Sequence, residues 1–432
     1  MNRTIGIGLA GFGTVGAGVY KHLHQNAEVI ALRSGVRFEV RAVAVRDPKK
    51  NRPIPLPDCP VFDNPMDLLD DDSIRVVVEL MGGIDQPLAF VLEAIQRGKV
   101  VVTGNKALLA EHGPEIFSKA ESAGVPVYYE AAVAGGIPII KAVRESFVGN
   151  RIEGIHGILN GTSNYILTRM TDAGLDYPAA LVEAQSLGYA EADPALDVNG
   201  WDAAHKAIIL ASLAYGFWVP SADVLVRGID GVSSADVQYA GELGYRIKLL
   251  ATIKGGTGKG IEVRVCPTLI PRDHVLASVN GVFNAVAVRG DVVGETLFYG
   301  RGAGQDPTSS SVLADLVTAA QALDNAPRCP GFTPHGLYGA CLQQSEAVSQ
   351  FYLRLAVEDR PGVLAAIAGV LGEAGIGISS MIQPEAHDGG FVPLILMIHD
   401  AKTGPMEEAL HRISSLSCVG RPPVMLHVET FS

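Results

Sequence analysis

The sequence feature that most constrains the fold lies at the start of the chain, where an apolar segment meets a run of glycines. Residues 4–10 predict a buried strand and residues 17–32 predict a helix. The six residues between them are Gly11, Phe12, Gly13, Thr14, Val15 and Gly16. In such a turn the first glycine permits the bend, the second lets a pyrophosphate approach the backbone, and the third allows close helix packing. A lone glycine motif is weak evidence, but between a strand and a helix it predicts a Rossmann-type dinucleotide-binding α/β domain.

The end of the second predicted strand, residues 38–45, is where this fold meets the adenosine ribose. An acid at that point would favour NAD, but the chain places Arg46 there, with two lysines close by. A guanidinium can hold a 2′-phosphate through paired N–H donors. An ordinary solvated turn explains the same residues equally well. The sequence therefore favours NADP as the cofactor and leaves NAD open.

Further glycine turns follow later strands. Residues 100–103 predict a strand that ends in a turn containing Lys106, at the edge of the sheet where a doubly wound fold binds its ligand. A second glycine-rich run, with Gly302 and Gly304, precedes a predicted helix at residues 310–322. We expect Lys106 and both glycines to approach the cofactor, and this helix to return to the nucleotide domain.

A cluster of acids surrounds one lysine in residues 184–206. Asp202 and Lys206 are four residues apart, so they share a helical face. An exposed pair of this kind would contribute only about 0.3 kcal/mol, but the apolar residues after Lys206 predict burial, and buried charges need partners. Glu191, Asp193 and Asp197 lie in the loop before the helix. Several carboxylates and a lysine suit a small substrate with an ammonium group and an oxygen to be protonated.

The same stretch closely resembles the signature of the homoserine dehydrogenase family. The matching positions are Ala184, Gly188, Asp193, Pro194, Asp197, Gly200, Asp202 and Lys206. The resemblance implies that Glu191 and Asp202 bind the homoserine amino group, that Asp197 shapes the pocket, and that Lys206 handles the proton at the reacting oxygen. It also implies cofactor contacts for Gly188 and Glu191. The fragment around Lys106 resembles the family too, and the residues alone do not rank the two lysines as proton donor.

A loop of small residues follows a predicted strand at residues 126–130. Alone, it reads as a tight interdomain hinge whose carbonyls and Glu130 can point at a cation. The family resemblance implies a sodium site formed by Glu130 and the carbonyls of Val133, Gly135 and Ile137. We expect a structural ion, because hydride transfer needs no metal.

Residues 160–164, Asn-Gly-Thr-Ser-Asn, form a polar turn before a predicted helix at residues 165–173. These side chains can cap the helix. They can equally contact substrate, and the sequence does not choose between the two roles.

The last part of the chain predicts a separate module. After a Pro- and Gly-rich linker at residues 325–349, the order of predicted elements is βαββαβ, which is a ferredoxin-like unit. Its first helix begins after Asp359-Arg360-Pro361-Gly362 and offers free amides to an amino-acid carboxylate. The motif and the order resemble an ACT domain, and the resemblance implies threonine as an inhibitory ligand. The alternative is a module retained for dimer contacts.

Composition limits the remaining classes of function. A net charge of -12 without any basic run argues against nucleic acid or an anionic membrane as partner. The five cysteines are scattered, which fits free thiols in a reducing cytoplasm. The start lacks the pattern of a signal peptide, and the longest apolar run is too short to span a bilayer. We therefore expect a cytoplasmic, soluble protein that acts on a small molecule.

Together these features predict an α/β protein of about three domains. They are a Rossmann-type dinucleotide-binding domain at residues 1–140 with a returning segment at about 305–325, an α+β substrate and dimerisation domain at 141–304, and an ACT-like domain at 350–432. The predicted function is NAD(P)H-dependent interconversion of aspartate 4-semialdehyde and homoserine, by a homodimer or homotetramer. The alternatives are another Rossmann-type reductase of amino-acid pathways, or a nicotinamide-sensing regulator without turnover.

Overall fold

The computed structural model describes residues 3–256, 260–323, 331–384 and 390–431. The chain forms two compact units, which we describe separately. Unit 1 comprises Met1–Ile155, His205–Ser221 and Asn284–Tyr338, and unit 2 comprises His156–Ala204, Ala222–Phe283 and Gly339–Ser432. Among the described residues, no helix is long and apolar enough to cross a membrane.

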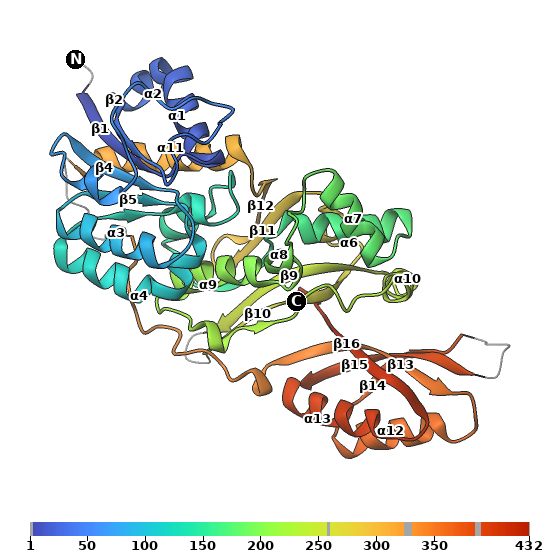
Figure 1. Cartoon of the computed structure of the whole chain (residues 1–432). Helices are drawn as coiled ribbons and strands as arrows, with labels where there is room; N and C mark the ends of the chain where they lie inside the picture. The colour runs from blue at the N-terminus through green and yellow to red at the C-terminus, as the bar shows by residue number, and fades with distance from the viewer. Residues whose placement is uncertain (1–2, 257–259, 324–330, 385–389, 432) are drawn as a thin grey trace. The chain divides into compact units, whose positions relative to one another are not determined.

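Unit 1 contains a parallel sheet whose strands, within the described residues, follow the order β3-β2-β1-β4-β5-β6 (Figure 1). The strands are β1 (Arg3–Ala10), β2 (Val36–Ala44), β3 (Val61–Phe62), β4 (Ile74–Glu79), β5 (Val100–Thr103) and β6 (Val127–Tyr128). Strands β4 and β5 are nearly continuous apolar runs, as expected for central strands that are buried on both faces. Because β2 and β4 flank β1, the strand order reverses at β1, which is where a doubly wound sheet forms its ligand crevice.

Helices pack against this sheet. They are α1 (Thr14–Gln25), α2 (Ala27–Ser34), α3 (Asp85–Gln96), α4 (Lys106–Ala123) and α11 (Gln305–Ala322). The predicted helix at 17–32 is in fact two helices, because Asn26 ends α1 and precedes α2. Helix α11 packs on α1 and β5. Gly18 permits this contact, since a Cβ there would lie 2.4 Å from Oγ of Ser309.

The rest of unit 1 consists of short elements and part of a longer helix. They are η2 (Glu130–Ala132), α5 (Ile139–Lys141), η3 (Ala142–Ser146), the start of β7 (Ile152–Ile158), most of β11 (Phe283–Gly290), and β12 (Gly294–Arg301). Helix α9 (Trp201–Tyr215) begins in unit 2 and continues in unit 1. The described part of the predicted linker that begins at residue 331 packs on unit 1, where His335 N donates to the Gly216 carbonyl at 2.7 Å.

Within unit 2 the strands follow the order β7-β9-β10-β16-β13-β15-β14, and β8 pairs with β10. The elements before the last module are α6 (Gly161–Ala173), α7 (Tyr177–Ser186), α8 (Ala195–Val198), η4 (Ser221–Asp223), β8 (Leu225–Val226), α10 (Ser234–Glu242), β9 (Tyr245–Gly256), β10 (Gly260–Pro271) and η5 (Val275–Ser278). Strands β9 and β10 are long, antiparallel and largely buried, so they form the centre of the sheet in this unit.

The C-terminal module has the predicted βαββαβ order. Its elements are η6 (Gln344–Glu346), β13 (Val348–Glu358), α12 (Val363–Glu373), β14 (Ile378–Ile382), β15 (Phe391–Lys402), α13 (Thr403–Ser414) and β16 (Val419–Val428). Both helices cover the same face of its sheet (Figure 1). Alternate residues of β13, such as Phe351, Leu353 and Leu355, point into one apolar core with the helices. The ferredoxin-like fold is therefore confirmed.

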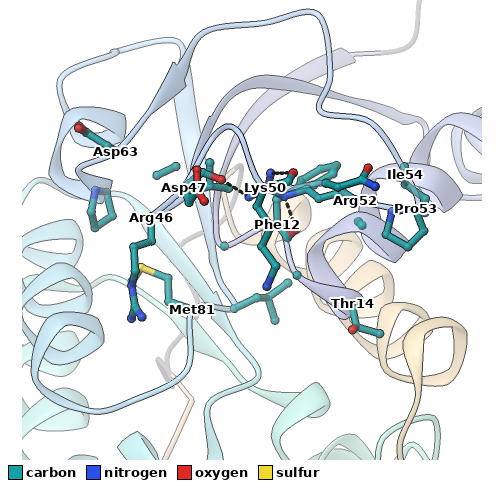
Figure 2. A pocket seen from close by; sticks show the side chains of 18 of the residues that line it. Phe12, Thr14, Arg46, Asp47, Lys50, Arg52, Pro53, Ile54, Asp63 and Met81 are labelled. Carbon is teal, nitrogen blue, oxygen red and sulfur yellow. Dashed lines mark hydrogen bonds between the residues drawn. The ribbon is translucent and has the colours of Figure 1, made fainter.

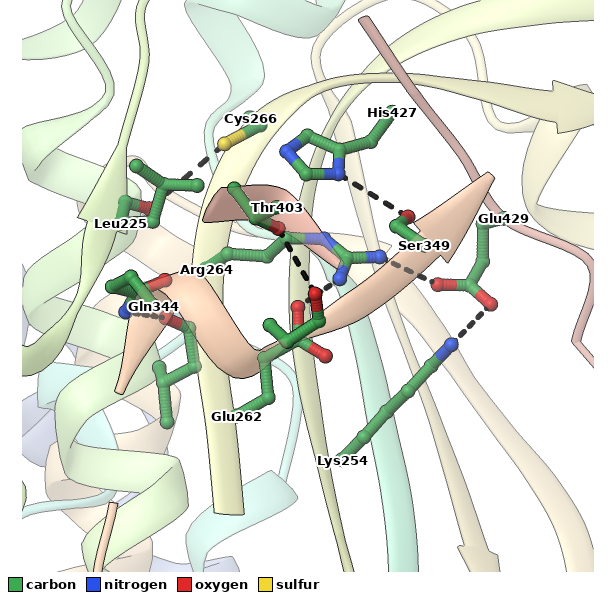
Figure 3. A network of polar contacts seen from close by, with 12 residues as sticks. Leu225, Lys254, Glu262, Arg264, Cys266, Gln344, Ser349, Thr403, His427 and Glu429 are labelled. Carbon is green, nitrogen blue, oxygen red and sulfur yellow. Dashed lines mark hydrogen bonds and ion pairs between the residues drawn. The ribbon is translucent and has the colours of Figure 1, made fainter. Parts of the chain in front are cut away.

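The C-terminal module is joined to the rest of unit 2 by more than its linker. Strand β16 pairs in parallel with β10, and Glu429 N donates to the Leu269 carbonyl at 3.0 Å. The Glu429 carboxylate is 1% exposed and lies 3.0 Å from Nη2 of Arg264 and 2.5 Å from Nζ of Lys254 (Figure 3). Arg264 also pairs with Glu262. Glu429, which directly follows β16, is thus fixed by ion pairs to β9 and β10.

Candidate active site

A cavity of about 850 Å3 lies in unit 1 beside the glycine turn (Figure 2). Of the residues predicted to bind a cofactor, those that line this cavity are Gly11, Phe12, Gly13, Thr14 and Arg46. Val15 faces α11, where its carbonyl accepts a hydrogen bond from Ser309 at 3.3 Å. The close approach at Gly16 is to the Gly11 carbonyl, which a Cβ would meet at 2.2 Å. This glycine therefore shapes the turn itself.

Cationic side chains surround the outer part of the cavity. Arg46, Lys50 and Arg52 all line it. The guanidinium of Arg52 donates to the carbonyls of Asp47 (2.7 Å), Lys50 (2.8 Å) and Phe12 (3.3 Å) (Figure 2). Arg52 therefore ties the loop after β2 to the glycine turn. The sequence analysis did not identify Arg52, because nothing in the local pattern indicates which carbonyls it reaches.

The ends of β4 and β5 hold a second polar group in unit 1. Glu79, fully buried, accepts hydrogen bonds from Met81 N at 2.8 Å and Thr103 Oγ1 at 2.6 Å. Burial raises the pKa of this carboxyl, against the effect of those donors. Asn105 caps α4 and donates to the Gly83 carbonyl at 2.8 Å. These bonds fix both glycine turns and the start of the helix whose first residue is Lys106. An acid at the end of an apolar strand was the available signal for Glu79.

In unit 2 the structure brings together two of the predicted substrate carboxylates. Nδ2 of Asn160 donates to Asp197 Oδ1 at 2.7 Å and to Asp202 Oδ2 at 2.8 Å. Asp202, in the first turn of α9, is 9% exposed, whereas Glu191 is exposed on the loop that follows α7. Gly188, with φ of 74°, follows the end of α7 and turns the chain into this loop. The site therefore has a buried carboxylate, a half-buried one and an exposed one.

Lys206 lies one helical turn after Asp202 on α9 and is 7% exposed. The five residues that follow it, Ala207, Ile208, Ile209, Leu210 and Ala211, are fully buried. The predicted burial of this helix is thus confirmed. A lysine held in such surroundings has few conformations open to it, which suits a group that must meet one atom of a substrate.

The loop predicted to bind sodium surrounds a buried carboxylate in unit 1. Glu130 is 3% exposed, and its oxygens accept hydrogen bonds from Ile140 N at 2.9 Å and Lys141 N at 2.8 Å. Its own amide donates to Asp315 Oδ2 at 2.7 Å. Burial, and secondly the charge of Glu130, raises the pKa of Asp315 to about 8. The sequence analysis missed Asp315, which comes from α11, far along the chain.

The backbone of that loop is bent at two residues. Ala134 and Gly135 have φ of 53° and 52°, in the left-handed region, which is unusual for alanine. The Gly135 carbonyl accepts a hydrogen bond from Ser311 at 2.6 Å, and a Cβ on Gly135 would lie 2.5 Å from the Gly302 carbonyl. Gly302 thus packs against the loop. The Ile137 carbonyl likewise accepts a hydrogen bond, from Ile139 N at 2.8 Å. A buried carboxylate beside several backbone carbonyls is a set of oxygens of the kind that hard cations prefer.

Comparison with known proteins identifies the family. A family model for homoserine dehydrogenase matches residues 138–317, its NAD binding domain matches 11–130, and an ACT domain matches 351–415. The chain is 48% identical to the homoserine dehydrogenase of Pseudomonas aeruginosa over 438 residues, with 99% of each chain covered. It is 44% identical to the one of Neisseria gonorrhoeae over 433 residues, again covering 99% of each.

Solved structures agree. A crystal structure of a homoserine dehydrogenase from Thiobacillus denitrificans matches with a TM-score of 0.93 and 44% identity, over 99% of this chain and 98% of that one. A hyperthermophilic archaeal homoserine dehydrogenase in complex with NADPH matches with a TM-score of 0.62 and 28% identity, over 74% of this chain and 98% of that one. The predicted fold class is confirmed. The chain belongs to the homoserine dehydrogenase family of NAD(P)-dependent oxidoreductases.

Proposed function

We propose that Glu191, Asp197, Asp202 and Lys206 divide the work of homoserine dehydrogenase as follows. Asp202 and Glu191 bind the substrate ammonium, Asp197 shapes that pocket, and Lys206 exchanges a proton with the oxygen on C4. A bound nicotinamide supplies the hydride chemistry. The observation that supports this most is the pair of carboxylates held by Asn160, one helical turn from a buried lysine.

Lys206→Ala tests this assignment. It should lower kcat by about 100-fold or more, the range of general acid–base catalysis, with a smaller change in KM for homoserine. Lys106→Ala is measured beside it, because Lys106 is the competing proton donor. Lys119→Ala, on the same helix as Lys106, is the control and should leave kcat unchanged. An unchanged rate for a folded Lys206→Ala enzyme, with a large loss for Lys106→Ala, would transfer the role to Lys106.

NADP is the proposed cofactor, because Arg46 and Lys50 line the outer part of the cavity beside the glycine turn. Two cations at the end of β2 suit a 2′-phosphate, which NAD lacks. Arg52 is already bonded to three carbonyls, so we assign it to the shape of this subsite rather than to the phosphate.

Sodium is the proposed structural ion of the Glu130 loop, with the carbonyls of Val133, Gly135 and Ile137 as further ligands. Support comes from the buried Glu130 carboxylate and from the left-handed turn, which redirects its carbonyls. If so, the melting temperature should be higher in sodium chloride than in choline chloride of equal ionic strength.

The ACT-like module offers a site for an amino acid at the start of α12. A cavity of about 400 Å3 there is lined by Asp359, Arg360, Gly362 and Gln383, among others. Gly362 has no side chain to cap the helix, so the first amides of α12 can receive a carboxylate, and Asp359 can receive an ammonium. We propose that threonine binds here and inhibits the enzyme.

A homodimer is the proposed assembly, formed through the β11–β12 region of unit 1. Strand β12 ends its sheet, and nearby apolar side chains are exposed: Val148 (81%), Val292 (77%) and Tyr299 (54%). An open strand edge with such side chains commonly pairs with another chain. Light scattering on the purified protein would give twice the mass of one chain. We also propose a cytoplasmic location, which cell fractionation would test.

A further inference from the structure

The polar turn before α6 holds residues 189–202, a segment that includes α8, the start of α9 and the proposed substrate carboxylates. Asn160 is 5% exposed, and all three of its side-chain hydrogen bonds are short. Its Oδ1 accepts from Ser163 N at 2.7 Å, while Nδ2 donates at 2.7 and 2.8 Å to Asp197 and Asp202. One side chain thus caps a helix and joins two acids that lie 37 and 42 residues away.

Only one orientation of this amide is compatible with its surroundings. If the oxygen and nitrogen of Asn160 were exchanged, its oxygen would face two carboxylates and its NH2 group would face the Ser163 amide. Every contact would then be between like partners. The two N–H donors of the amide match the two carboxylates one to one.

We propose that Asn160 is a positioning residue, which aims Asp202 at the substrate ammonium and holds Asp197 in the wall of the same pocket. Two carboxylates in one pocket repel each other, and a donor between them offsets that repulsion and fixes their relative orientation. A substrate ammonium then meets carboxylates that are already oriented, which lowers the entropic cost of binding. This inference rests on the ammonium-binding role proposed above for Asp202.

The backbone of the segment 189–202 is held by two other residues of the polar turn, Thr162 and Ser163. Thr162 Oγ1 donates to the Tyr189 carbonyl at 2.7 Å, and Ser163 Oγ donates to the Asp197 carbonyl at 2.8 Å. Asn164, which follows, receives a hydrogen bond from the buried Lys248 at 3.1 Å. Because these bonds do not involve the Asn160 amide, its loss should release the two carboxylates without unfolding the loop.

Asn160→Ser separates positioning from capping, because serine is as good an N-cap as asparagine but cannot reach both carboxylates. Without the amide, the substrate must itself order both carboxylates, and that ordering cost corresponds to a factor of roughly 10 in affinity. We expect KM for homoserine to rise at least about 10-fold, with kcat changed less than about 3-fold and KM for NADP unchanged. If Asn160 only caps the helix, Asn160→Ser would at most lower the melting temperature and would leave KM for homoserine and kcat unchanged.

Two control variants complete the experiment. Asp176→Ala removes the N-cap of α7, whose carboxylate accepts from Ala179 N at 3.0 Å, and it should lower stability but leave KM for homoserine unchanged. Asp202→Asn should raise KM for homoserine by itself. If Asn160→Ser does not fold, Asn160→Asp replaces it. Aspartate has the size of asparagine and can still cap α6, but in place of the NH2 group it presents an oxygen that repels both carboxylates. It should also raise KM for homoserine.

The outcomes are distinct. A rise in KM for homoserine in both the Asn160 and Asp202 variants supports positioning. An effect of Asp202→Asn without an effect at Asn160 overturns the positioning role alone. If Asp202→Asn leaves KM unchanged, the proposed ammonium site is wrong, and the role of Asn160 is wrong with it.

Discussion

Removing the charge of Glu429 should destabilise unit 2 strongly. Glu429 and Arg264 are each 1% exposed and form an ion pair of 3.0 Å. Glu429→Gln leaves the size of the side chain unchanged and removes one partner of a buried cation. Breaking such a pair typically costs 3–5 kcal/mol. Since Arg264 keeps Glu262 as a partner, we expect the lower end, about 3 kcal/mol.

The loss should depend on pH in a defined direction. Burial alone would raise the pKa of Glu429, but His156, Lys254 and Arg264 outweigh burial and hold the pKa well below its usual range. A carboxyl with a lowered folded-state pKa stabilises the fold fully above its unfolded pKa of about 4.3, and this contribution is lost as pH falls below that value. The difference between wild type and Glu429→Gln should therefore be largest near neutral pH and shrink in acid.

Urea unfolding followed by circular dichroism, at about pH 7 and pH 4, measures this difference. The matched control is Glu346→Gln, which removes a pair with Lys402 whose side chains are 54% and 52% exposed. Such an exposed pair is worth only about 0–1 kcal/mol. If Glu429→Gln unfolds at the same urea concentration as the control, the network on β10 does not hold the end of the chain.

The remaining predictions concern cofactor and regulation. Arg46→Ala should raise KM for NADPH by about 10-fold and spare NADH, because the 2′-phosphate loses a charge-assisted partner; equal effects on both cofactors would mean that Arg46 does not contact the phosphate. The control is Arg33→Ala, at the end of α2. Threonine added during NADPH consumption should slow the full-length enzyme, and Asp359→Asn should raise the threonine concentration needed by about 10-fold; no inhibition of wild type at any accessible concentration would end the regulatory hypothesis.

For the C-terminal module, the sequence predicted the fold correctly but did not show that the module pairs with β10 of the same unit. The order βαββαβ follows from local patterns, and the structure confirms it. From the Pro- and Gly-rich linker we expected a separate module, and truncation after about residue 350 would then be the simplest test of its role. Because β16 pairs with β10 and Glu429 is buried against Arg264, that truncation would also leave a buried arginine without one of its partners. Point substitutions at Asp359 are therefore the better test of threonine binding.

Local sequence determined those features that depend on neighbours in the chain. The glycine turn before α1 follows from the bends that only glycine accepts, and the buried face of α9 follows from the apolar run after Lys206. The acidic loop could be identified because its residues are close in sequence and unusually spaced. The family resemblance, now confirmed, rests on the same short-range pattern.

Only the tertiary structure decided which distant residues meet. Asn160 reaches one acid on α8 and another on α9, Asp315 approaches Glu130 from 185 residues away, and Arg264 meets Glu429 across 165 residues. None of these pairs has a local signature, because an amide or a carboxylate looks the same in sequence whether it is solvated or buried. Packing removes water from these groups, and a buried polar group must then find whichever partner the fold brings within hydrogen-bonding distance.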